Sequence, residues 1–319
     1  MTHAGAHSTL SGKRIWVAGH RGMLGSALMR RLAGESPAEL LHATREALDL
    51  RDPGAVLAWT RDTKPEIVFV PAGTVGGIRA NLSYPADFLR DNTLISVNVI
   101  DAAFRAGAEK LVYVASSAVY PVDAAQPLTE SALLTGPLEA AHAGYAFAKL
   151  AGIKMCETYR TQFGCDFISV LPTNLYGPGD SYDLENAHVV PALIRKAHEA
   201  RLRGERDLEI WGSGASRRDF LHVDDCADGL VHLARRYSGE TPVNVGSGAD
   251  VRIAELAALV METVGLDGAL VCDRSKPDGA PRRLLDTRTL QALGWHPSIG
   301  LREGLASAYR DFCARYGQA

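Results

Sequence analysis

Tyr145 and Lys149 are the pair whose residue types and spacing most directly indicate acid–base chemistry. They lie four positions apart in a segment expected to be helical, so both side chains project from one helix face. A tyrosine hydroxyl with its ordinary pKa of about 10 transfers protons poorly at neutral pH, but a neighbouring lysine ammonium lowers that pKa. Ser116 or Ser117, at the end of an expected strand, could hydrogen-bond a substrate oxygen nearby. Because Tyr-x-x-x-Lys also occurs by chance in helices, the prediction of an acid–base site depends on the rest of the chain.

A glycine-rich turn follows the first expected strand. Gly19, Gly22 and Gly25 stand in a GxxGxxG pattern, and Met23 opens the expected helix. Such glycines let the backbone turn sharply and approach a pyrophosphate, while the N–H groups of the helix N-terminus attract the anion. Because this turn joins a strand to a helix in a βαβ pattern, it predicts a dinucleotide cofactor.

The first charged side chain after the second expected strand is Arg45. An acidic residue at this place would hold the ribose hydroxyls of NAD, whereas an arginine favours the 2′-phosphate of NADP. Arg21, inside the glycine turn, could add a second cation. We therefore expect NADP(H), with the alternative that both arginines are solvated surface side chains.

Strand-like and helix-like segments alternate in the order needed to position these residues. Expected strands cover residues 14–18, 39–43, 66–70, 110–115 and 166–171, and expected helices cover 23–33, 87–106 and 144–163. The alternation predicts an α/β fold with a Rossmann-type, doubly wound parallel sheet.

After Pro172 the segments become shorter and richer in glycine, with one helix expected at 189–200. We expect a smaller C-terminal substrate-binding lobe here. The predicted division is an NADP-binding domain at 11–175 and a nucleotide-sugar-binding lobe drawn mainly from 176–319, with segments near 220–247 returning to the first domain.

The composition is that of an ordinary globular protein. The 319 residues include 34 Lys and Arg against 37 Asp and Glu, a formal net charge of −3. This balance argues against a dedicated nucleic-acid binder. No apolar stretch approaches the about 20 residues that span a bilayer, and residues 1–13 contain no apolar leader. The five cysteines lack metal-ligand or redox-motif spacing, so we expect reduced thiols, no metal site, no membrane partner and a cytoplasmic protein.

Several longer motifs relate the chain to known enzymes. They are Ala18–Met23, Val75–Ile78, Tyr84–Phe88, Pro172–Pro178, Leu221–Asp225 and Ser275–Gly279. With these motifs the sequence resembles the extended short-chain dehydrogenase/reductases (the NAD-dependent epimerase/dehydratase family), and within them the GDP-L-fucose synthase branch, from about Arg14 to about Phe312. Members of that branch epimerise GDP-4-keto-6-deoxy-D-mannose at C3 and C5 and then reduce C4 with NADPH. The resemblance also implies a homodimer.

The resemblance implies roles at the matching positions. Ser116, Tyr145 and Lys149 match the catalytic triad, in which Tyr145 protonates the C4 oxygen, and His188 matches the general acid/base of epimerisation. Cofactor contacts are implied at Pro172, Asn174 and Leu175, and nucleotide-sugar contacts at Lys196, Trp211, Arg218 and Asp278. Cations suit diphosphate charge and an indole suits packing against a ring. The alternatives left open are a core tryptophan and surface cations.

The chain departs from the branch at its epimerisation residues. Where the branch has a cysteine two positions after Ser116, this chain has Ala118, whose methyl group carries no exchangeable proton. Where the branch has Pro-Thr-Asn-Glu-Pro before the tyrosine, residues 140–144 read Ala-Ala-His-Ala-Gly, and Thr74 replaces a residue that is usually basic. His142 could be a replacement acid or base, or a solvated loop histidine. Inverting a carbon beside a ketone ordinarily takes two groups, one on each side.

We therefore expect NADPH-dependent reduction of the C4 ketone of a GDP-linked 4-keto-6-deoxyhexose, without the full C3/C5 epimerisation. The alternative is a bifunctional GDP-L-fucose synthase in which another group replaces the cysteine. An alternative of another class is a non-catalytic nucleotide-sugar-binding protein, against which the intact Ser116, Tyr145 and Lys149 argue. The sequence leaves open the base, the sugar and the stereochemistry at C4.

Overall fold

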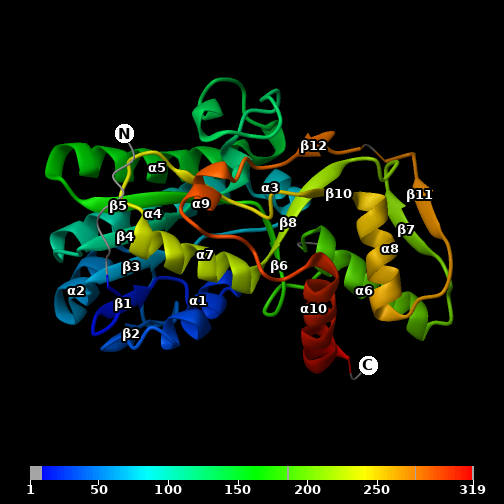
Figure 1. The fold of residues 1–319 in the computed structure, drawn as a ribbon, viewed down its shortest axis with the longest axis horizontal. Helices are drawn as coiled ribbons and strands as arrows, with labels where there is room; N and C mark the ends of the chain where they lie inside the picture. Colours follow the sequence, from blue (N-terminus) through cyan, green and yellow to red (C-terminus); the bar gives the residue numbers. More distant parts are fainter. Residues whose placement is uncertain (1–8, 185–186, 277, 318–319) are drawn as a thin grey trace.

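A six-stranded sheet forms the centre of the computed structural model, which describes residues 9–184, 187–276 and 278–317 (Figure 1). Residues 1–8, part of the segment in which no apolar leader is expected, lie outside the described residues. So does Pro277 of the motif Ser275–Gly279. The strand order is β2-β1-β3-β4-β5-β9, and every pairing is parallel. The strands are β1 Arg14–Val17, β2 Glu39–Leu41, β3 Ile67–Val70, β4 Lys110–Val114, β5 Asp166–Pro172 and β9 Val243–Val245.

The strand order reverses between β1 and β3, and this fixes where a ligand can bind. Trp16 of β1 lies opposite Leu41 of β2 on one side and Val68 of β3 on the other. Chains leaving these strands therefore run to opposite sides, which opens a crevice at their carboxyl ends. All four residues of β3 are buried, as expected for a strand that is covered on both faces.

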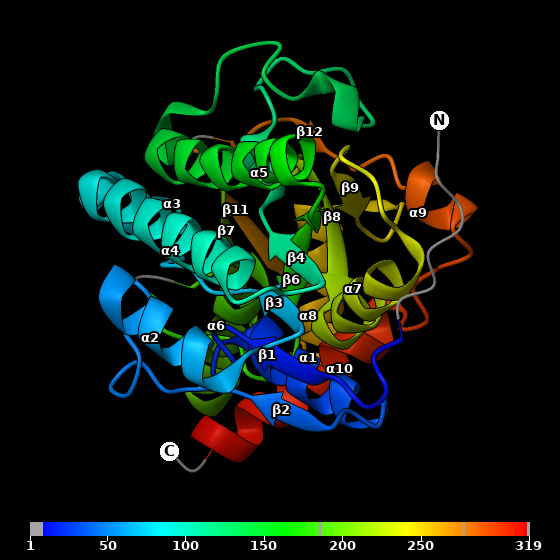
Figure 2. The ribbon, with the colours of Figure 1, turned by 90° about the vertical axis from the view of Figure 1, so that its left-hand side faces the viewer.

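Helices cover both faces of this sheet (Figure 2). α1, α7 and α9 share one apolar core with the sheet, and α2, α4 and α5 share another. Their bounds are α1 Met23–Ala33, α2 Pro53–Thr63, α4 Pro85–Arg105, α5 Ala143–Phe163, α7 Val223–Arg236 and α9 Arg288–Ala292. The short α3 Ile78–Ser83 precedes α4, and single 3-10 turns occur at η1 Ser117–Val119, η2 Glu130–Ala132 and η3 Ala140–His142.

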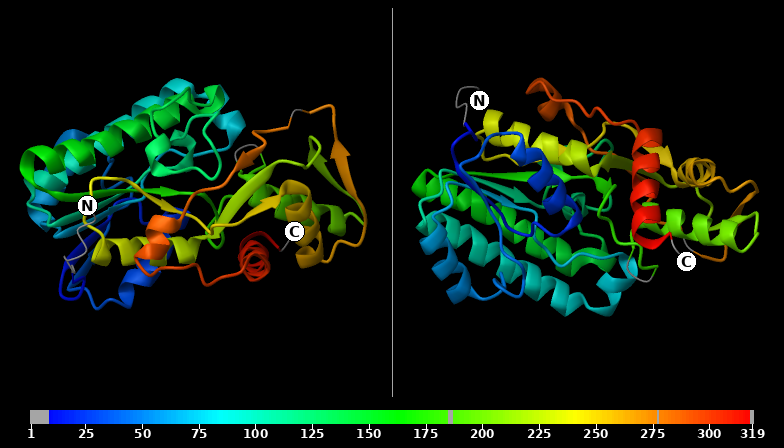
Figure 3. Two further views of the ribbon diagram at one scale, coloured as in Figure 1. Left: turned by 45° about the horizontal axis from the view of Figure 1, so that its top comes forward. Right: turned by 90° about the horizontal axis from the view of Figure 1, so that it is seen from below.

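The remaining elements gather at one end of the molecule (Figure 3). β8 is the centre of a small sheet in which β6 and β12 pair with it in parallel and β10 pairs antiparallel, and β7 pairs with β11. A third apolar core joins them to α6, α8 and α10. The bounds are β6 Asn174–Tyr176, α6 Val189–Leu202, β7 Leu208–Trp211, β8 Arg217–His222, β10 Asp250–Arg252, α8 Ile253–Val264, β11 Leu270–Asp273, β12 Arg282–Arg283 and α10 Leu301–Tyr316.

The fold class expected from the sequence is confirmed, and each expected strand and helix has an observed counterpart. The elements that were not predicted include α2 and α3 in the first half of the chain and all helices and strands after α6. α2 begins at Pro53, and Asp52 caps it by accepting hydrogen bonds from the N–H groups of Gly54 and Ala55, so a Pro-Gly pair typical of turns here opens a helix. Among the described helices, none combines the length and the apolar content needed to cross a bilayer.

Candidate active site

Two cavities meet at the predicted acid–base residues. The first, which we call the sheet cavity, has a volume of about 390 Å³ and runs along the carboxyl ends of β1, β3 and β4. The second, the lobe cavity, has a volume of about 660 Å³ and extends to α6, β7 and β8 of the C-terminal lobe. Ser116, Tyr145, Thr173 and Leu175 line both cavities. These residues therefore stand where a ligand in one cavity can reach a ligand in the other.

The glycine turn lines the sheet cavity and needs its glycines for space. Gly19 has φ +97°, and a Cβ there would lie 2.8 Å from the Cα of Ala72, at the end of β3. A Cβ at Gly25 would lie 2.0 Å from the carbonyl oxygen of Gly19. Gly22 is the N-cap of α1 and offers no side-chain cap, so the N-terminus of this helix stays open to an anion.

The sheet cavity brings together most residues predicted for the cofactor. It is lined by Gly19, Gly22, Met23, Gly25, Arg45, Lys149, Pro172 and Leu175. Arg21 lies outside the lining, with a side chain that is 69% exposed and 3.7 Å from the carboxylate of Glu46. Asn174 lines the lobe cavity instead and donates to the carbonyl of Asp219. Leu175 lines both cavities, whereas the Asn174 side chain, on the other face of the strand, does not reach the sheet cavity. The cofactor roles of Arg21 and Asn174 stay predictions.

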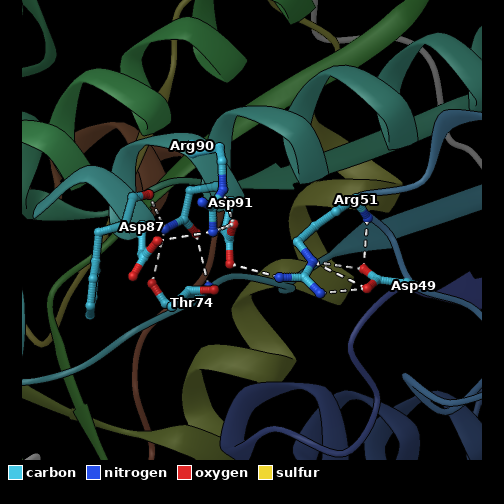
Figure 4. A network of polar contacts seen from close by, with 8 residues as sticks. Asp49, Arg51, Thr74, Asp87, Arg90 and Asp91 are labelled. Atoms are coloured by element: carbon cyan, nitrogen blue, oxygen red, sulfur yellow. Dashed lines mark hydrogen bonds and ion pairs between the residues drawn. The ribbon is translucent and has the colours of Figure 1, made fainter. Parts of the chain in front are cut away.

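Arg51, which was not predicted from the sequence, lines the sheet cavity and lies between Asp49 and Asp91 in a polar network (Figure 4). Its guanidinium donates to the carboxylate of Asp49 at 2.6 Å and to that of Asp91 on α4 at 3.0 Å. The Arg51 hydrogen bonds lower the pKa of Asp49 to about 2. Because two carboxylates already neutralise Arg51, Arg45 is the better placed of these two lining cations to meet an incoming phosphate.

Asn92 of α4 holds the loop after β3, which lines both cavities. Its side chain accepts from the N–H of Thr74 and donates to the Thr74 carbonyl, both at 3.0 Å. A Cβ at Gly73 would lie 2.8 Å from the amide oxygen of Asn92, so this loop fits only with a glycine at that position. Asn92 therefore holds Thr74 through backbone hydrogen bonds, which do not depend on the side chain at position 74.

Ser116, Tyr145 and Lys149 come together at the junction of the cavities. Ser116 follows β4, and its side chain is near enough to the Tyr145 hydroxyl to lower the pKa of Tyr145. Lys149, one turn further along α5, is buried and donates from Nζ to the carbonyl of Val114 at 3.0 Å and more weakly to that of Ala72 at 3.4 Å. Between the two serines considered, the geometry favours Ser116, because Ser116 lines both cavities with Tyr145 whereas Ser117 lines only the lobe cavity.

The electrostatics of this trio differ from the expectation that lysine lowers the tyrosine pKa. Burial raises the pKa of Tyr145 to about 12, against a smaller lowering by the Ser116 hydrogen bond. Burial also lowers the pKa of Lys149 to about 8. The physical reason is that the ammonium is turned toward backbone carbonyls, 5.9 Å from the centre of the Tyr145 ring. In the protein alone, the phenol therefore stays protonated at neutral pH.

The lobe cavity collects the residues predicted to bind a nucleotide sugar. Trp211 is 53% exposed on its lining, so the alternative of a core tryptophan is wrong. The Nζ of Lys196 lies 5.8 Å from the Trp211 ring centre. Arg218 also lines the cavity and donates to the carbonyl of Ala280, and burial lowers its pKa. Arg283, missed by the sequence analysis, adds a third cation and donates to Glu139 at 2.9 Å.

Asp278 lies beside the lobe cavity and not in its lining. One carboxylate oxygen accepts from the N–H of Ser213 and the other from the Ser213 hydroxyl, both at 2.8 Å. A Cβ at Gly212 would lie 2.3 Å from the same carboxylate. Asp278 therefore fastens the turn after β7, which carries Trp211, and its contact with substrate stays a prediction.

His188, Ala118 and His142 also line the lobe cavity. His188 is the N-cap of α6, and its imidazole is accessible from the cavity. Ala118 lies in the 3-10 turn that follows Ser116. His142 has a side chain that is 21% exposed and lines this cavity, so it does not project freely into solvent.

Comparisons with known proteins agree with this geometry. The model of the NAD dependent epimerase/dehydratase family matches residues 15–246. A GDP-L-fucose synthase of Sinorhizobium fredii is 52% identical over 303 residues, covering 95% of this chain and 96% of that protein. The structure of a GDP-L-fucose synthetase from Naegleria fowleri bound to NADP superposes with a TM-score of 0.91 at 27% identity, covering 99% and 97% of the two chains. A GDP-mannoheptose C4 reductase from Campylobacter jejuni with NADP bound gives 0.84 at 36% identity, covering 96% and 99%.

Replacing Lys149 by methionine tests the burial of its ammonium. Because the folded-state pKa is about 8 and the ordinary value is 10.5, the unfolded chain binds more protons between these pH values. Stability of the parent should therefore rise with pH across this window relative to Lys149→Met, in urea unfolding at a series of pH values. Lys154→Met, an exposed lysine of the same helix, should give a profile parallel to the parent. A parallel profile for Lys149→Met would contradict the assignment.

Proposed function

Because the chain belongs to the NAD dependent epimerase/dehydratase family, we propose that it is an NADP(H)-dependent oxidoreductase of a GDP-linked sugar. In its finer form, the reaction reduces the C4 ketone of a GDP-linked 4-keto-6-deoxyhexose. The observation that carries this proposal is that Ser116 and Tyr145 line both cavities. A ketone presented from the lobe cavity thus meets its proton donor beside the cofactor. A non-catalytic binding protein would have no need of this arrangement.

The residues of the sheet cavity fit the cofactor. The turn at Gly19 and Gly25 leaves no room for side chains, the N-terminus of α1 is open to the pyrophosphate, and Arg45 can pair with a 2′-phosphate. When bound, NADPH supplies the hydride for the ketone carbon. Its use by a C4 reductase and by a GDP-L-fucose synthetase of similar structure supports the same choice here.

Tyr145 and Ser116 supply the proton chemistry of the reduction. The Tyr145 phenol, whose pKa burial raises to about 12, is protonated at neutral pH and can donate its proton to the C4 oxygen. Ser116 can hydrogen-bond the same oxygen and orient it. The Lys149 ammonium lies 5.9 Å from the centre of the Tyr145 ring, and a turn of its side chain toward the phenolate would stabilise the anion that remains after transfer.

The lobe cavity has the chemistry of a nucleoside-diphosphate site. Lys196, Arg218 and Arg283 supply positive charge for the diphosphate, and the exposed Trp211 offers a face for the base. The relatives compared act on GDP-linked sugars by name, which supports guanine as the base. The five cysteines are all free, in keeping with a reducing compartment, and we place the enzyme in the cytoplasm.

Two candidate reactions differ in whether epimerisation precedes reduction. The expectation of reduction alone depends on Ala118, and similarity to a C4 reductase supports it. Identity of 52% to a GDP-L-fucose synthase over nearly the full length supports the bifunctional alternative. Two histidines on one cavity favour it as well, because they are groups able to carry protons near neutral pH. We therefore prefer the bifunctional 3,5-epimerase/4-reductase.

Solvent-isotope incorporation separates these two reactions. The protein is incubated with GDP-4-keto-6-deoxymannose and NADPH in deuterated water, and the product is examined by NMR. We expect deuterium at both C3 and C5, because each inversion exchanges a carbon-bound proton. A reduced product without deuterium at either carbon would support the reductase activity and contradict the epimerase activity.

Tyr145→Phe tests the reductase assignment. Removing the only proton that the phenol can donate should slow NADPH oxidation by about 100-fold or more, the usual size of a general-acid contribution. Binding of NADPH, followed by fluorescence titration, should persist because the ring remains. If Tyr145→Phe oxidised NADPH as fast as the parent, the assigned chemistry would be wrong.

We also propose that the protein is a homodimer formed across the outer face of α4. Leu94 and Val97, three positions apart on this helix, are 37% and 39% exposed, and Phe147 of the adjoining α5 is 57% exposed. Light scattering should give twice the chain mass of 34.2 kDa for the parent. Val97→Glu should give the single-chain mass, whereas Val122→Glu, an exposed valine elsewhere, should not. A parent with the single-chain mass would overturn this proposal.

A further inference from the structure

His142 and His188 face the same cavity from different parts of the fold. His142 ends the 3-10 turn η3, directly before α5, and His188 is the N-cap of α6 in the C-terminal lobe. Both line the lobe cavity, as do Ser116 and Tyr145 at the ketone end. The two imidazoles are close enough for the charge of His142 to lower the pKa of His188. Both can therefore reach a sugar ring that is bound in this cavity.

Charged side chains surround His142. Its Nδ1 lies 3.8 Å from the carboxylate of Glu139, which in turn accepts a hydrogen bond from Arg283. Burial and the Arg283 charge lower the pKa of His142, and Glu139 partly opposes this. Arg79 of α3 lines the same cavity. Because Arg283 pairs with Glu139, the Glu139 carboxylate is already engaged and is not a free base.

Inversion at a carbon beside a ketone needs one group to remove the proton and another to return it on the opposite face. Among the described residues that line the lobe cavity, the imidazoles of His142 and His188 are the side chains with an ordinary pKa near neutrality. Tyr145 remains protonated and is needed for the ketone oxygen. Ala118 offers only a methyl group.

We propose that His142 is the second proton-transfer residue of the epimerisation and works as a pair with His188. One neutral imidazole takes the proton from C3, the C–H electron pair moves into an enolate with its charge on the C4 oxygen, and the other imidazolium returns a proton to the opposite face. The same exchange follows at C5. Each inversion leaves the substrate formula unchanged, and each imidazole regains its starting protonation state by exchange with water.

The pairing also explains how one histidine can be charged while the other is neutral. Protonation of either imidazole disfavours protonation of its neighbour, so the pair holds one proton most readily. Glu139 favours the proton on His142, whereas Arg79, Arg218 and Arg283 around the same cavity oppose a second positive charge. A single proton held by the pair makes one imidazole the acid and leaves the other as the base.

This inference rests on the bifunctional reaction proposed above, and His142→Asn tests it. Asparagine keeps a hydrogen-bonding side chain but carries no titratable proton. Deuterium incorporation at C3 and C5 should fall about 100-fold or more, the usual size of an acid–base contribution. The rate of GDP-L-fucose oxidation by NADP⁺ reports the C4 step alone. We expect the fold-loss in this rate to be at least about tenfold smaller than the fold-loss in deuterium incorporation. His296→Asn, an exposed histidine outside the cavity, should match the parent in both assays.

A double variant guards against a merely structural effect. Ala118→Cys places a thiol on the same cavity, and it should restore measurable deuterium incorporation to His142→Asn. Parent-like incorporation by His142→Asn, or an equal loss in both assays without rescue by the thiol, would overturn the role of His142 and leave the proposed function intact. A parent that incorporates no deuterium would instead overturn the bifunctional function itself.

Discussion

The buried ammonium of Lys149 connects the sheet to the helix that carries the proton donor. It is held where β3 and β4 end, by the carbonyls of Val114 and Ala72. A dehydrated ammonium is costly without such partners, so the carbonyls fix its place and with it the position of α5 against the sheet. Tyr145 is one turn earlier on that helix and is thereby brought to Ser116. Because that meeting point lies at the end of the strands, it opens to both cavities.

Charge in this protein is local and serves the two cavities. The chain as a whole carries a formal charge of −3, yet Arg45 lines one cavity and Lys196, Arg218 and Arg283 line the other. A few cations placed on the cavity linings suit small anionic ligands and need no basic surface. The unremarkable overall composition is thus compatible with two nucleotide ligands bound at once.

The sequence predicted those features that depend on local spacing. The glycine turn, the Tyr145–Lys149 pair and the alternating strands and helices each lie within a short stretch of chain, so periodicity and residue type were sufficient. Contacts between distant segments were not predictable in this way: Arg51 meets Asp91 across 40 positions, and Arg283 meets Glu139 across 144. The direction in which the Lys149 ammonium points could not be predicted from the sequence either. For this reason the expected lowering of the Tyr145 pKa by Lys149 is not found. The resemblance that implied a substrate contact for Asp278 could not predict that Ser213 donates hydrogen bonds to both of its carboxylate oxygens.

The proposed function places the cofactor and the nucleotide sugar in separate cavities that meet at Ser116 and Tyr145. A crystal structure of the protein with NADP⁺ and GDP bound would test this placement. We expect the pyrophosphate of NADP⁺ at the glycine turn, its nicotinamide beside Tyr145, and GDP between Trp211 and Arg218 in the lobe cavity. GDP in the sheet cavity, or a nicotinamide remote from Tyr145, would contradict it.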